Sequence, residues 1–187
     1  ITMRQKHIHN KSQFWAPAQH TLSSMTAFQK LVCGIMKHGK KQKAFSIVYN
    51  AMNLAQEKLS TFPQNQIPGS SVTQAKASTS FLGNDFQFLM QAIENVRPSL
   101  EVRSKKIAGI SREIPCLVPL HRGQGIAIRW LLDSARTRKK TGNRGFTENL
   151  ADELLDAYLQ KGTPCQKRDA LHKTASTNRA YLRYRWW

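Results

Sequence analysis

Basic side chains gather in a few segments of the sequence, and one such segment sits where phosphate binding is favourable. Lys40, Lys41 and Lys43 follow Gly39, a residue at which one helix is expected to stop and the next to begin. Lysine supplies a compact positive charge, and the free N–H groups at a helix start also attract anions. The pattern predicts a phosphate site, while a solvated surface run of lysines is the alternative.

A second basic segment is expected to form a β-hairpin over residues 100–119. β-Forming residues dominate it, and Gly109 falls where the turn would be. Such a small ribbon buries little surface, so we expect it to protrude. Charges on both flanks would meet RNA phosphates, or would only keep an edge strand from aggregating. These charges are Arg103, Lys105, Lys106 and Arg112.

The last residues interleave cations with aromatic rings. Their order is Arg183, Tyr184, Arg185, Trp186 and Trp187. Rings can stack on unpaired bases while the cations contact phosphate, so the pattern favours binding to single-stranded RNA. The alternative is a hydrophobic anchor onto the protein's own core.

Residues suited to catalysis or metal binding do not form a recognisable constellation. The sequence has no Gly-rich phosphate loop that ends in Lys-Ser or Lys-Thr, and no glycine-flanked nucleophilic serine. The histidines and cysteines stand too far apart for metal-ligand spacing or a disulfide framework. They include His38, His121, His172, Cys33, Cys116 and Cys165. We therefore expect no catalytic residue, metal or cofactor.

Three acidic residues near the C-terminal end require a separate interpretation. Asp152, Glu153 and Asp156 resemble a pair of catalytic carboxylates, but they more simply predict the solvated acidic face of a helix. Such a face should point away from RNA or toward a basic neighbour.

Composition limits the class of partner. The 187 residues carry a formal net charge of +18, and 40% of them are hydrophobic. That is enough for one folded domain, whose excess charge repels itself unless an anionic partner neutralises it. No apolar run approaches the roughly 18 residues of a membrane span, so we expect no membrane segment. Nucleic acid, an anionic membrane and acidic protein are the candidate partners, and the composition argues against an ordinary metabolic enzyme.

The elements that must position these residues are mostly helical. Periodicity predicts one helix, or two joined at Gly39, over 28–59, and a mobile loop over 60–84. Further helices are expected from Phe86 to Arg97-Pro98 and over 126–139, with Trp130 on the buried side. Another should end at Gly162, and a last one should run to about Tyr181. Its expected capping box consists of Thr163, Pro164 and Gln166.

An ordered series of motifs resembles the small-subunit ribosomal protein seven family. The resemblance covers about 28–60 and 85–187, and its most diagnostic stretch is 92–106. The motifs are Gly39-Lys40-Lys41, Ile47-Val48-Tyr49-Asn50-Ala51, Ala92-Ile93-Glu94-Asn95-Val96-Arg97-Pro98, Glu101-Val102-Arg103-Ser104-Lys105-Lys106, Ala127-Ile128-Arg129-Trp130-Leu131, Ala135-Arg136, Ala151-Asp152-Glu153-Leu154, Lys167-Arg168 with His172, Asn178-Arg179-Ala180 and Tyr184-Arg185-Trp186.

This resemblance implies a six-helix, bundle-like core with a protruding basic β-hairpin and an extended N-terminal arm. The domains would be a basic arm at 1–27 and a single helical RNA-binding domain at 28–187, with an insertion at 60–84 and the hairpin at 100–119. Where the family usually has Gly-Gly in the hairpin turn, this chain has Ala108-Gly109, so the turn should differ slightly.

The resemblance also implies partners and contact residues. The partners would be the 3′ major domain of small-subunit rRNA, exit-site tRNA and mRNA near the hairpin, and neighbouring head proteins, with a role in nucleating head assembly. Beyond the hairpin residues, the expected rRNA contacts are Lys40, Lys41, Lys43, Arg97, Arg129, Arg136, Arg138, Lys139, Arg144, Lys167, Arg168, His172, Arg179, Arg183, Arg185 and Trp186.

Details of the C-terminal segments are similar to mitochondrial members of the family from plants or algae, in particular 155–158, 175–179 and the double Trp. A mitochondrial ribosome is therefore expected, with a plastid or the bacterial cytoplasm as alternatives. A free regulatory nucleic-acid-binding protein remains the alternative function, and a basic RNA-modifying enzyme is a third hypothesis.

Overall fold

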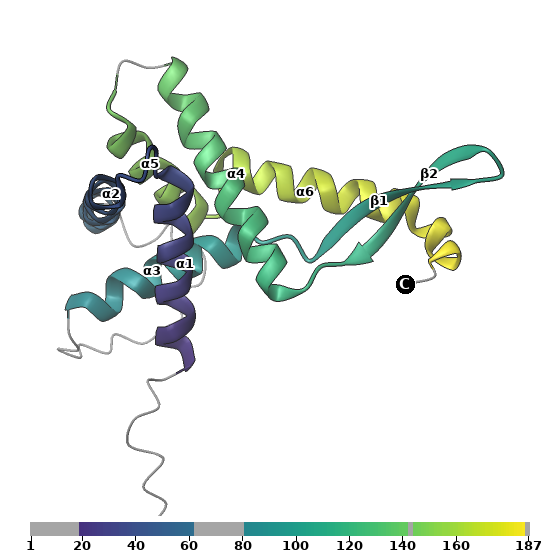
Figure 1. Ribbon diagram of the computed structural model, residues 1–187, viewed down its shortest axis with the longest axis horizontal. Helices are drawn as coiled ribbons and strands as arrows, with labels where there is room; N and C mark the ends of the chain where they lie inside the picture. Colours follow the sequence, from purple (N-terminus) through teal and green to yellow (C-terminus); the bar gives the residue numbers. More distant parts are fainter. Residues whose placement is uncertain (1–18, 62–80, 142–143, 186–187) are drawn as a thin grey trace, which may run out of the picture.

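The protein is described from a computed structural model, which covers residues 19–61, 81–141 and 144–185. Its described part is mostly helical and carries one antiparallel two-stranded hairpin, as expected (Figure 1). The elements in order are α1 (Gln19–Ile35), α2 (Lys41–Thr61), α3 (Phe81–Val96), β1 (Leu100–Ile107), β2 (Ile110–Leu117), α4 (Leu120–Thr141), α5 (Phe146–Tyr158), α6 (Gly162–Thr177) and the short 3₁₀-helix η3 (Asn178–Tyr184).

The core of the molecule surrounds α5. This helix packs against α2, α3 and α4, and Leu150 and Leu154 on it are fully buried. Met52 from α2, Ile93 from α3 and Leu131 from α4 meet it there. The apolar periodicity of each helix thus turns one face toward α5, because a helix buries the stripe that recurs every three to four residues.

A tight turn joins α1 to α2. His38 and Gly39 both have positive φ, at 52° and 70°, and the Lys41 N–H donates to the Gly39 carbonyl. Glycine adopts this left-handed region without steric cost, so the predicted stop at Gly39 is confirmed. The turn places the lysines that follow Gly39 at the beginning of α2.

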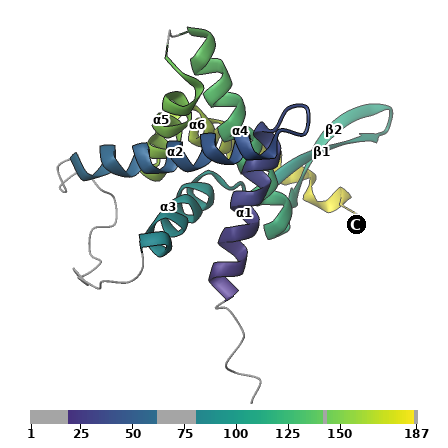
Figure 2. The same cartoon turned by 60° about the vertical axis from the view of Figure 1, so that its left-hand side comes forward.

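The hairpin follows α3 directly and extends away from α1 to α5, with α6 and η3 beside it (Figures 1 and 2). Helix α3 ends at Val96 because Pro98 restrains the residue before it. The two strands pair from Leu100 opposite Leu117 to Ile107 opposite Ile110, which leaves a two-residue turn.

The turn residues Ala108 and Gly109 have φ values of 50° and 80°. Positive φ at both positions is the requirement of a type I′ turn, whose twist matches that of the strands. Ala108 adopts the conformation although its Cβ disfavours it, so the Ala-Gly pair preserves the turn at some cost in strain.

The boundaries of two expected segments differ in the structure. α1 begins at Gln19, so 19–27 is helical and does not belong to an extended arm; residues 1–18 lie outside the described residues. α3 begins at Phe81, so the expected loop ends four residues early, and 62–80 is not described. The start of α1 is rich in Ser and Thr, and Gly83-Asn84 in the first turn of α3 is typical of a loop, so local composition hid both helix starts.

The predicted capping box at the start of α6 is wrong. The cap residue is Lys161, whose side chain makes no capping bond, and α6 begins at Gly162, which was expected to end α5. The Thr163 hydroxyl instead donates to Ser134 Oγ on α4 at 2.8 Å. A tertiary partner therefore takes the hydroxyl that the local pattern assigned to the backbone.

The predicted burial of Trp130 is only partly correct. Its side chain packs against the core but stays partly exposed, while Leu131 beside it is fully buried. Adjacent helix positions point about 100° apart, so a small rotation of α4 decides which of the two faces α5.

Candidate nucleic-acid interface

The lysines at the start of α2 present free charge to solvent. Lys40, Lys41 and Lys43 are exposed, and none forms an ion pair with another residue that the structure describes. Uncompensated ammonium groups next to a helix start attract anions. The geometry therefore suits the phosphate site that the sequence predicts.

The root of the hairpin is held by one buried carboxylate. Glu101 on β1 is 9% exposed and accepts hydrogen bonds from Arg103 Nε and from Arg122 Nε on α4, both at 2.8 Å. Burial alone would raise the pKa of Glu101, but the hydrogen bonds and charges of the two arginines outweigh it and lower the pKa. The carboxylate thus stays charged and ties the hairpin to α4.

Cys116 lies across the hairpin from Glu101. Its Sγ donates to the Glu101 carbonyl at 3.5 Å, and burial raises the pKa of the thiol. A buried, protonated thiol is chemically inert, which fits a structural cysteine.

The C-terminal 3₁₀-helix η3 packs against the hairpin, and its rings are engaged there. Arg112 Nη1 donates to Tyr181 Oη at 3.0 Å, and the guanidinium lies 5.2 Å from the centre of the same ring. Lys105 Nζ donates to the Tyr184 carbonyl at 3.2 Å. Asn178 completes the contact by donating to the Glu113 carboxylate. We call this set of contacts the brace.

Lys106 and the exposed cations of the C-terminal segments differ in their contacts. Lys106 makes no ion pair within the described residues. Arg183 lies 4.9 Å from the centre of the Tyr184 ring. Lys167 is exposed on α6, Arg179 near the start of η3 and Arg185 directly after it, whereas Trp186 lies outside the described residues. Exposed basic side chains are therefore present on both the hairpin and η3.

The acidic residues of α5 do not form a solvated face, which corrects the sequence-based expectation. Glu153 is buried at 2% exposure, and Arg138 of α4 pairs with it at 3.1 Å and with Asp156 at 2.7 Å. Asp152 pairs with Lys58 of α2 and with Arg144. The acids face a basic neighbour, as one of the two expectations had it, but that neighbour belongs to the same chain. Arg138 is thereby engaged by acids of the same chain, although its side chain stays partly exposed.

Several other predicted contact residues also have structural partners. Arg97 pairs with Glu94, Arg168 binds the Asn95 carbonyl and Asp169, and His172 Nε2 accepts the Ser99 N–H at 3.2 Å. Arg136 Nη2 donates to the Gly34 carbonyl at 2.8 Å, and Arg129 Nε donates to the Gly125 carbonyl at 3.1 Å, although both side chains remain exposed. The side chain of Lys139 lies outside the described residues.

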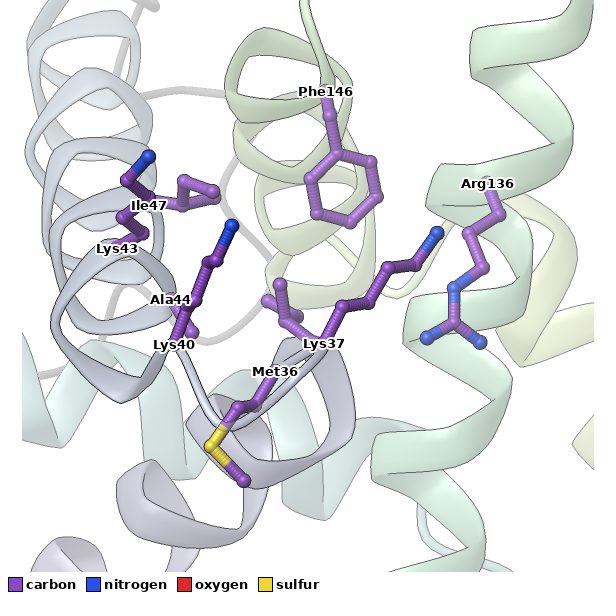
Figure 3. A pocket seen from close by; sticks show the side chains of 9 residues that line it. Met36, Lys37, Lys40, Lys43, Ala44, Ile47, Arg136 and Phe146 are labelled. Carbon is purple, nitrogen blue, oxygen red and sulfur yellow. The ribbon is translucent and has the colours of Figure 1, made fainter.

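Three residues of the interface were not predicted from the sequence. Arg122 clamps Glu101, while Lys37 and Phe146 line a pocket beside the α2 lysines (Figure 3). Lys37 precedes Gly39 by two residues, so its place in the same basic run was a usable signal. The others meet their partners only through tertiary contacts.

Metal clusters and membrane-spanning helices are both absent from the described residues. No group of three or more His, Cys, Asp or Glu side chains there is arranged to hold a metal ion. None of the helices in the described ranges is long and apolar enough to span a bilayer.

Comparison with known proteins identifies relatives of this chain. The family model described as "Ribosomal protein S7p/S5e" matches residues 3–179. The "Small ribosomal subunit protein uS7" of Sulfurihydrogenibium sp. (strain YO3AOP1) is 36% identical over 157 residues, which cover 84% of this chain and 85% of that protein. The protein of the same name from Legionella pneumophila (strain Corby) is 35% identical over 157 residues, with coverage of 84% and 86%.

A mitochondrial relative matches a shorter region more closely. The "Small ribosomal subunit protein uS7m" of Prototheca wickerhamii is 44% identical over 101 residues, which cover 54% of this chain and 46% of that protein.

Proposed function

The chain belongs to the ribosomal protein S7p/S5e family, and on that premise we propose that it is a structural, non-enzymatic constituent of the small ribosomal subunit that binds its rRNA. The observation that carries the proposal is the hairpin, a basic ribbon that leaves the helical core and is fastened at its root and along its side. A ribbon held in this way offers Lys106 to phosphate on one face, while Lys105 and Arg112 on the other face contact η3.

The finer assignment follows the family resemblance. We propose binding to the 3′ major domain, early in the assembly of the head, with the hairpin near exit-site tRNA and mRNA. Neighbouring head proteins would be further partners. The fixed orientation of the hairpin supports this role, because a free ribbon would lose conformational entropy when it docks among RNA strands.

The contact residues separate into two groups. One group has no competing ion pair within the described residues and consists of Lys40, Lys41, Lys43 and Lys106. These lysines can bind phosphate without first breaking an ion pair of the protein. Arg138 already serves Glu153 and Asp156, and we expect it to support the fold instead of the RNA contact.

The proposed compartment is the mitochondrion. The relative from Prototheca wickerhamii has a higher identity over its shorter match than the bacterial relatives have over theirs, which supports a mitochondrial small subunit. Bacterial cytoplasm and plastid are the alternatives that localisation of the tagged protein would distinguish.

Binding of the full chain to a 3′ major-domain rRNA fragment tests the proposal, with duplex DNA of similar length as competitor. Lys106→Ala should reduce the slope of log affinity against log salt by roughly 0.7 to 0.9, the effect of one lost phosphate contact. Lys161→Ala, an exposed lysine at the start of α6, is the matched control and should leave the slope unchanged. Equal affinity for DNA and rRNA would overturn the proposal, and so would an unaltered slope for Lys106→Ala.

A further inference from the structure

A pocket between α2 and α4 combines apolar walls with a cationic rim (Figure 3). Its volume of about 630 Å³ falls within the range of roughly 300 to 1,000 Å³ that is common for small-molecule sites. Its lining residues are Ile35, Met36, Lys37, Lys40, Lys43, Ala44, Ile47, Arg136 and Phe146. They come from α1, the turn after it, α2, α4 and α5, so only the folded chain forms the pocket.

The walls provide a flat apolar surface. Phe146 is the first residue of α5, and Figure 3 shows its ring directed into the pocket. Ile35 and Ile47 are partly buried, and Met36 is 36% exposed. An aromatic ring next to aliphatic side chains is the kind of platform on which a planar base stacks.

The rim is positive and contains no acid. Lys37, Lys40 and Lys43 pair with no carboxylate in the described part of the chain, and Arg136 is oriented by its bond to the Gly34 carbonyl. The α5 helix also begins here without a side-chain cap, at Gly145, so its first N–H groups add partial positive charge. The acids closest in sequence to Phe146 and Arg136 are Glu148, in the first turn of α5, and Asp133, which pairs with Arg136. Neither acid lines the pocket.

We propose that this pocket takes one unstacked RNA nucleotide, with its base against Phe146 and its flanking phosphates on Lys37, Lys40 and Lys43. The inference rests on the proposed function in taking RNA as the partner, and it adds a base-dependent contact to a surface otherwise suited to phosphate alone. A free phosphate ion would neutralise the lysines but leave the apolar walls exposed to water. An apolar helix would fill the walls but leave three charges unneutralised.

Two single-stranded RNA probes isolate the contribution of the base. One is an oligouridylate of about six nucleotides, and the other has the same sugar-phosphate backbone without bases. The full chain should bind the first at least about fivefold more tightly, because stacking of a base on an aromatic ring contributes that much or more. Phe146→Leu keeps an apolar side chain but removes the ring, so it should abolish most of the difference.

The control for this variant is Phe45→Leu. Phe45 is also a phenylalanine of this region, 45% exposed on α2 and stacked on Tyr49, but it does not line the pocket. Its replacement should leave the preference for the base-bearing probe intact. Loss of the preference in Phe45→Leu but not in Phe146→Leu would move the stacking site out of the pocket and overturn the inference.

The phosphate part has its own variant. Lys40→Gln combined with Lys43→Gln should lower the salt slope by roughly 0.7 for each lost contact, equally with both probes. An unchanged slope would overturn the assignment of the phosphates to these lysines.

A crosslink measurement does not depend on the folding of Phe146→Leu. Oligouridylate that carries a photoreactive thiouridine should attach to the wild-type chain within residues 35–47 or at Phe146. Attachment confined to other segments, or equal binding of the two probes, overturns the inference. If the rRNA fragment still binds in that case, the proposed function stands; if neither rRNA nor oligouridylate binds, both fail.

Discussion

Replacing Arg138 by Gln is expected to leave a buried carboxylate without its counter-charge. Glu153 is 2% exposed, and its Oε1 lies 3.1 Å from Arg138 Nη2. At an effective dielectric constant of about 20, unit charges this close attract each other by about 5 kcal/mol. Arg138 is 35% exposed, so solvent screens part of this attraction. We therefore expect the free energy of unfolding to fall by about 3 kcal/mol, at the lower end of the range for a broken buried pair.

The same loss should depend on pH with a defined sign. Burial raises the pKa of Glu153 above its ordinary value of 4.5, while Arg138 lowers it partway back. A carboxyl with a raised folded-state pKa holds its proton more tightly when folded, so its burial destabilises the protein as the pH rises from the unfolded-state pKa through the folded-state pKa. Without Arg138 the folded-state pKa rises further. The deficit of the variant should therefore be smaller at about pH 4 than at about pH 7.

Urea unfolding followed by circular dichroism measures both effects. Glu153→Gln removes the buried charge while keeping the side-chain shape, so the double variant Arg138→Gln/Glu153→Gln should recover most of the stability at neutral pH. Three results would refute the reasoning: a loss below about 1 kcal/mol, a loss of equal size at both pH values, or a double variant no more stable than Arg138→Gln.

Two further predictions concern the brace and α4. Tyr181→Phe removes the hydroxyl that accepts the Arg112 hydrogen bond at 3.0 Å, so hairpin amides should exchange several-fold faster while global unfolding changes by less than about 1 kcal/mol; unchanged exchange would mean that η3 does not hold the hairpin. Leu131→Ala should cost about 2 to 5 kcal/mol in urea unfolding, and Trp130→Ala should cost less because its ring is only partly buried; the reverse order would show that Trp130 is the true core residue.

Short-range patterns were sufficient to predict most of the helices and the hairpin. Apolar residues recur at helical spacing in α2 and α4, and the type I′ turn at Ala108-Gly109 needs only its own two residues and the strands beside them. These features depend on the conformational preferences of residues close together in sequence, so the sequence carries them directly. The helix starts at Gln19 and Phe81 were missed because the Ser, Thr, Gly and Asn residues near them are typical of loops.

The charge count determined the class of partner, but it did not distinguish the individual cations. Lys40 and Arg138 look equivalent in a sequence, since both are basic residues near a helix. In the fold, Lys40 faces solvent without an ion pair among the described residues, whereas Arg138 is drawn into α5 by Glu153. Which cation is free for phosphate depends on where the acids fall in space, and that depends on helix packing.

By itself, then, the sequence determined the helical class, the position of the hairpin and the need for an anionic partner, because periodicity, turn chemistry and net charge are local or additive properties. Only the tertiary structure decided that Thr163 bonds to Ser134 and does not cap its own helix. Only the tertiary structure brought Phe146 to the lysines near Gly39. Such contacts join different helices, and they arise when several helices bury their apolar faces together, a condition that no single segment specifies.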